Sequence, residues 1–158
     1  MMLRHTLATL AYRSAKVVRD VPADFSTFTP TPGSRSAGQI LAHMGDLMDW
    51  SVSIVEGRQT WRDSTPQAWD ADTRRFFASL AKFDALLAGP RDAAPGLREG
   101  TEEKLFQGPV SDALTHVGQL AILRRIAGAP IKGENYFAAD VRAGRVGQDQ
   151  TPPKQQFR

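Results

Sequence analysis

Apolar residues along the first part of the chain recur at intervals of three and four, the spacing of one face of a helix. Over residues 3 to 20 these positions are Leu3, Leu7, Leu10, Ala11, Ala15 and Val18. A second helix is predicted to begin after Ser36, because Ser36 and Gln39 have the form of a capping box. We expect this helix to reach about Glu56 and to stop at Gly57.

Two further helices follow from the same kind of pattern. One is predicted over residues 66 to 88, with Thr65 as its cap and Gly89 as its stop. The other is predicted from Pro109 to about Ala127. Between them the chain contains Pro and Gly, and residues 105 to 108 are expected to form a short turn or an edge piece. Four long helices without convincing β-strand patterns predict an all-α four-helix bundle.

The domain organisation that we expect is simple. Residues 1 to 145 are predicted to form a single helical-bundle domain, and residues 146 to 158 an irregular C-terminal tail with a frayed end. The chain has 158 residues, 41% of them hydrophobic and 23% charged, which is ordinary for a globular protein. A core of this size does not require a metal or a disulfide for its stability, so we expect any metal site to be functional.

The composition excludes several functions. The chain has no cysteine, and therefore no disulfide, thiolate metal site or cysteine nucleophile of its own. Its net charge is only +3, and the basic residues are scattered, which argues against nucleic-acid binding. No apolar stretch approaches the length of a membrane span or of a signal-peptide core, so we expect no membrane association and a cytoplasmic location.

Three residues on two of the predicted helices have the composition of a metal site. His43 lies on the second helix, and Asp112 and His116 lie on the fourth, four residues apart on one face. Both helices are otherwise largely apolar around these positions, where a bare imidazole or carboxylate would cost several kcal/mol. Two histidines and one carboxylate suit a divalent ion such as zinc, nickel, iron or manganese, with positions left open for water or substrate.

Alternatives to this site follow from the same residues. Asp112 and His116 also have the spacing of an ordinary surface ion pair, with His43 as a hydrogen-bonded interior imidazole. Asp46 and Gln119 are candidates for supporting positions next to the ligands, and no residue is assigned as catalytic.

These segments resemble a known family. The stretch Ile40-Leu-Ala-His43-Met-Gly-Asp46-Leu and the later stretch Asp112-Ala-Leu-Thr-His116-Val-Gly-Gln119-Leu resemble the DinB-like (DinB/YfiT) superfamily of bacterial helical-bundle metalloproteins. The resemblance extends from the first helix to Gly128. It implies that His43 and His116 are metal ligands. At Asp112 the family usually has histidine, and a carboxylate there makes the site harder and more negative.

The resemblance also implies a class of function. Related bundles include transferases and isomerases that use a low-molecular-weight thiol as cosubstrate, and a chain without cysteine fits such a scheme. We therefore expect a divalent-metal-dependent enzyme, a thiol-dependent transferase acting on a small molecule. The alternatives are a metal-dependent hydrolase, in which Asp46 assists, and a non-catalytic bundle that binds a small ligand or a partner. An apolar helix face would also allow a homodimer.

Overall fold

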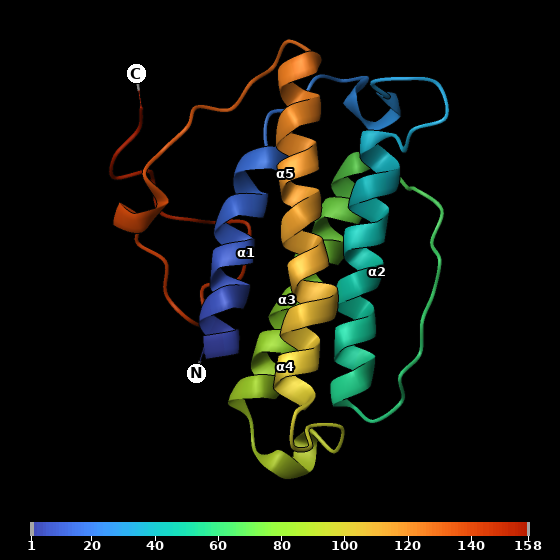
Figure 1. Cartoon of the computed structure of the whole chain (residues 1–158), viewed down its shortest axis with the longest axis vertical. Coiled ribbons are helices and arrows are strands. Elements are labelled where there is room, and N and C mark those ends of the chain that lie inside the picture. The colour runs from blue at the N-terminus through green and yellow to red at the C-terminus, as the bar shows by residue number, and fades with distance from the viewer. Residues whose placement is uncertain (1, 158) are drawn as a thin grey trace.

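The computed structural model describes residues 2–157 and is a bundle of four long helices (Figure 1). These helices are α1 (Met2–Val18), α2 (Ala37–Val55), α3 (Trp69–Ala88) and α5 (Ser111–Ile126). The predicted all-α four-helix bundle is therefore confirmed. The apolar faces of the helices meet in one core, whose largest fully buried side chains are Tyr12, Phe25, Phe76, Phe83, Leu7, Leu10, Leu41, Met44, Met48, Leu80, Leu105 and Leu120. Within residues 2–157, no helix is long and apolar enough to cross a membrane.

The start of α2 follows the predicted capping box. The Ser36 hydroxyl accepts a hydrogen bond from the backbone N–H of Gln39 at 3.2 Å, and the Gln39 side-chain oxygen accepts one from the backbone N–H of Ser36 at 2.8 Å. A short 3-10 helix, η1 (Phe25–Thr27), precedes this cap and packs against α2. The cap fixes where α2 begins and so places His43 in its second turn.

A long connection between α2 and α3 sets the topology of the bundle. The two helices pack along each other and run in the same direction, so residues 58–68 must return along the whole length of α2 (Figure 1). We call these residues the crossover loop. Because they are needed to span the bundle, α3 begins at Trp69, three residues later than predicted, and Thr65 does not act as its cap.

The fourth predicted helix begins earlier than the sequence suggested. A short helix, α4 (Thr101–Leu105), leads through a π-helical turn, η3 (Phe106–Val110), directly into α5. Residues 105 to 108 are thus helical, and the expected turn or edge piece is wrong. The wider π turn accommodates Pro109, which has no N–H to donate and whose ring would clash within a regular α-helix.

The tail is irregular, as predicted, but its end is held. After α5 the chain, which includes the short 3-10 helix η4 (Tyr136–Ala138), folds back beside α1 (Figure 1). Another short 3-10 helix, η2 (Arg91–Ala93), lies between α3 and α4. The backbone N–H of Phe157 donates to Gly133 at 3.0 Å, and that of Asn135 donates to Gln155 at 2.9 Å. Val146 is buried in the main core. These contacts contradict the expected frayed end over the described part of the tail.

Candidate metal centre

The packing of α2 against α5 brings the three sequence-predicted ligands together. Nε2 of His43 lies 3.4 Å from Oδ2 of Asp112, and Nε2 of His116 lies 3.4 Å from Oδ1 of the same carboxylate. One ligand atom from each of the three residues falls within 4.8 Å of the other two. Both histidines thus present the same ring nitrogen to one carboxylate.

The surroundings of the three side chains differ. The His116 side chain is 8% exposed and that of His43 18%, whereas that of Asp112 is 46% exposed. The two imidazole rings meet edge to face, with centroids 5.0 Å apart. The two histidines are therefore largely buried in the bundle, whereas the Asp112 carboxylate is accessible to solvent.

Gln119 lies one turn beyond His116 on α5 and orients its ring. Oε1 of Gln119 is 2.8 Å from Nδ1 of His116, which suits the tautomer in which Nδ1 carries the proton and donates it to the amide oxygen. This tautomer leaves a lone pair on Nε2, the atom that faces Asp112. A hydrogen bond to the far nitrogen of a histidine is the usual support of a metal ligand.

The distances within the group are compatible both with ligands around a shared ion and with a long ion pair, since each histidine lies 3.4 Å from a different oxygen of Asp112. A charge-assisted hydrogen bond between an imidazolium and a carboxylate is about 2.7 to 2.9 Å long. Ligand atoms at about 2.0 to 2.2 Å from a tetrahedral ion are about 3.3 to 3.6 Å apart. Both imidazole–carboxylate distances here are 3.4 Å. The donor set, two imidazole nitrogens and a carboxylate oxygen, suits zinc, iron, nickel or manganese.

The ring of Trp61, whose position the sequence did not reveal, covers one side of His43. The ring of Trp61, on the crossover loop, meets the His43 ring edge to face with centroids 5.7 Å apart, and it meets the Trp50 ring at the same distance. Trp61 is 43% exposed. Its place could not be predicted because residues 58–68 have no periodic pattern.

Asp46 belongs to a different network from the one expected. Its buried carboxylate accepts hydrogen bonds from the Ser64 backbone N–H at 2.9 Å and from the Ser64 hydroxyl at 2.6 Å. Arg75 of α3 donates to it at 2.5 Å and to Asp49 at 2.7 Å. All of its hydrogen bonds among residues 2–157 go to these two partners. Asp46 therefore anchors the crossover loop and α3 to α2.

The Arg75 guanidinium is the centre of this anchor. Burial lowers the pKa of Arg75, but its hydrogen bonds to Asp46 and Asp49 outweigh that effect and raise the pKa. The Ser79 hydroxyl donates to the other oxygen of Asp49. The crossover loop is thus held by a charged network, and through it Trp61 is held over His43.

Comparison with known proteins gives no relative: no family model, no curated protein and no solved structure matches this chain. The function must therefore be argued from the site.

Proposed function

We propose that this protein is a divalent-metal-dependent enzyme of the DinB-like superfamily, with His43, Asp112 and His116 as the metal ligands. The observation that carries the proposal is the shared carboxylate, 3.4 Å from the Nε2 atoms of both histidines. The hydrogen bond from His116 to Gln119 supports the same reading, because it prepares Nε2 as a donor to metal.

The reaction that we propose is transfer of a low-molecular-weight thiol to a small molecule. Its sulfur forms a bond to an electrophilic carbon, the thiol proton passes to solvent, and the substrate releases its leaving group. A divalent ion at this centre would lower the pKa of a bound thiol. The thiol must come from outside, because the chain has no cysteine.

The protein's own residues contribute position and access. The buried His116 and the partly buried His43 fix two ligands on separate helices, and the exposed edge of Asp112 leaves the centre reachable from solvent. Trp61 covers one side of His43. Asp46 is saturated by Ser64 and Arg75, which argues against a role for it as a base in hydrolysis.

Metal content of the purified protein tests the proposal directly. Elemental analysis of protein prepared without chelator should give close to one divalent ion per chain, and His116→Ala should lose it while circular dichroism keeps its helical signal. His5→Ala is the matched control, because His5 is exposed and lies outside the group. A wild-type protein without metal would overturn the proposal.

Thiol dependence then separates the reaction classes. With an electrophilic aromatic halide as the probe, the metal-loaded protein should release halide only when a low-molecular-weight thiol is added. Turnover without thiol would instead assign metal-assisted hydrolysis. A metal-loaded protein that is inactive under both conditions would contradict thiol transfer to this class of substrate.

A further inference from the structure

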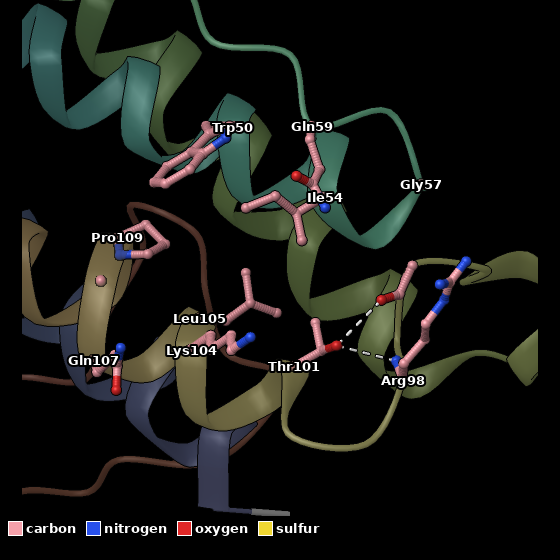
Figure 2. Close-up of a pocket in the computed structure, with 12 residues that line it drawn as sticks. Trp50, Ile54, Gly57, Gln59, Arg98, Thr101, Lys104, Leu105, Gln107 and Pro109 are labelled. Carbon is pink, nitrogen blue, oxygen red and sulfur yellow. Dashed lines mark hydrogen bonds between the residues drawn. The ribbon is translucent and has the colours of Figure 1, made fainter.

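A cavity of about 510 Å³ lies at one end of the bundle, between the C-terminal half of α2 and the segment formed by α4 and η3 (Figure 2). This volume is within the range of sites that hold small organic ligands, about 300 to 1,000 Å³. None of the three proposed metal ligands lines it. It is therefore a space separate from the metal centre.

The cavity is aligned with the metal centre along both helices. Trp50, at one edge of the cavity, follows His43 by seven residues, which is two turns along the same face of α2. Pro109, across from Trp50 in Figure 2, precedes Asp112 by three residues, which is one turn. Trp61 contacts both His43 and Trp50. A ligand in the cavity would thus extend toward the metal centre at its Trp50 end.

The inner walls of the cavity are apolar. Trp50 and Ile54 line it from α2, and Leu105 and Pro109 line it from the opposite side (Figure 2). Leu105 and Pro109 are buried, Leu105 belongs to the hydrophobic core, and Trp50 and Ile54 are half-buried. Such a surface favours the apolar or aromatic body of a ligand.

The outer rim of the cavity is cationic. Arg98 and Lys104 are its charged lining residues, and no carboxylate lines it. Neither side chain forms an ion pair within residues 2–157. Figure 2 shows the two side chains on opposite sides of Thr101, and an unpaired cation beside the apolar wall favours an anionic group on a ligand.

The rim is fixed by a tight turn. The Thr101 hydroxyl accepts a hydrogen bond from the backbone N–H of Arg98 at 3.1 Å and donates one to the Gly96 carbonyl at 3.3 Å (Figure 2). Gly96 in turn donates its N–H to Val55 at 2.8 Å. A Cβ on Gly96 would lie 1.7 Å from the Ile54 carbonyl oxygen, so only glycine allows this approach. The turn therefore docks against the end of α2 and places Arg98 at the cavity.

The π-helical turn η3 supplies a further sign of a site. Gln107, Gly108 and Pro109 of this turn line the cavity, and the helix continues from it to Asp112. Isolated π turns within helices occur frequently at functional sites. Here the turn joins the wall of the cavity to a proposed metal ligand.

We propose that this cavity binds the part of the substrate remote from the reacting atoms, and that the substrate has an apolar or aromatic body ending in an oxyanion group such as a carboxylate. Trp50, Ile54 and Pro109 contact the body, and the positive charges of Arg98 and Lys104 attract the anion. The inference rests on the proposed function for the identity of the reacting centre. The binding of a ligand with an apolar body and an anionic group to this cavity is tested without metal.

The test is a titration followed by nuclear magnetic resonance. The ¹⁵N-labelled chain, treated with chelator, is titrated with 4-phenylbutyrate and separately with the neutral 4-phenylbutan-1-ol, and the indole N–H signal of Trp50 is assigned with Trp50→Phe. We expect the carboxylate to shift this signal and to bind at least about fivefold more tightly than the alcohol. The double variant Arg98→Ala/Lys104→Ala should remove that preference while still binding the alcohol.

A matched control and a metal measurement make the outcomes distinct. Arg125→Ala/Lys154→Ala removes the same charges at exposed positions outside the cavity and should keep the preference. No shift at Trp50, equal affinity for the two probes, or a preference that survives the double variant would each overturn the inference. A chain that fails to bind metal but shows the preference would overturn the proposed function alone.

Discussion

Oε1 of Gln119 lies 2.8 Å from Nδ1 of His116, on the ring edge opposite the nitrogen that faces Asp112. The contact restrains the rotation of the ring. We expect Gln119→Ala to keep the fold and to weaken metal affinity by about 10- to 100-fold, because the ring then loses its orientation. Competition with a chromophoric chelator measures this affinity. Gln119→Glu keeps an acceptor at the same place and should restore binding; equal affinity for the alanine variant and wild type would contradict the supporting role.

Asp112 supplies the only carboxylate of the proposed ligand group. We expect Asp112→His to retain a metal while the ratio of zinc affinity to manganese affinity rises, because a third imidazole is a softer ligand than a carboxylate. Equilibrium dialysis against mixtures of the two ions measures that ratio. Asp149→Ala, at an exposed position outside the group, is the control and should leave it unchanged. An unchanged ratio in Asp112→His would show that the carboxylate does not bind the ion.

The proposed ligand group can be predicted from the sequence because its members lie on regular helices. Asp112 and His116 are four residues apart, and their common face follows from the helical repeat. The capping box at Ser36 fixed the start of α2, and with it the turn that carries His43. The four-helix architecture followed from the same periodicity, since each helix buries one apolar face.

The parts that sequence reasoning missed depend on contacts between distant residues. The place of Asp46 near His43 makes it a candidate for supporting the proposed ligands, but its partners Ser64 and Arg75 lie on the crossover loop and on α3. The contact of Trp61 with His43 likewise joins the crossover loop to α2, two segments whose packing the sequence pattern does not predict. Pro109 predicts a helix start because proline favours that position, whereas a π turn admits it within a continuous helix.

Asp46 is predicted to contribute stability and no metal binding. Its carboxylate is 1% exposed, so Asp46→Ala leaves the partly buried Arg75 charge and two Ser64 donors without this acceptor. We expect the free energy of unfolding in urea to fall by about 3 kcal/mol. The exposed Asp63→Ala should change it by less than about 0.5 kcal/mol. Full metal loss in a folded Asp46→Ala protein would contradict the anchoring role.

Trp61 is predicted to shield His43. In the metal-free protein, we expect Trp61→Ala to increase the rate at which diethyl pyrocarbonate modifies His43, because removal of the indole uncovers one side of the imidazole. Peptide mapping by mass spectrometry reports each histidine separately, and His5, which is exposed, serves as the internal reference. Trp61→Phe keeps an aromatic ring and should give a smaller increase. An unchanged rate at His43 in Trp61→Ala would show that the ring does not cover it.

Tyr12 is predicted to limit stability at alkaline pH. Its side chain is 1% exposed, and its hydroxyl has no hydrogen-bond partner within residues 2–157. Burial raises the pKa of this phenol, and the neighbouring Glu134 carboxylate raises it further. A neutral Tyr12 is therefore favoured in the folded state. The contribution of the neutral phenol to the free energy of unfolding is fully present below about pH 10, the ordinary pKa of tyrosine, and is lost as the pH rises toward the higher folded value.

We expect Tyr12→Phe to match wild type within about 1 kcal/mol at pH 7, because it removes only an unpartnered hydroxyl, and to be the more stable protein above about pH 10. Urea unfolding between pH 7 and a pH above about 10 measures the difference in free energy of unfolding between the two proteins. Lysine titration affects both proteins equally and therefore cancels in this difference. Parallel curves above pH 10 would show that the Tyr12 hydroxyl ionises as readily in the folded chain as in the unfolded one.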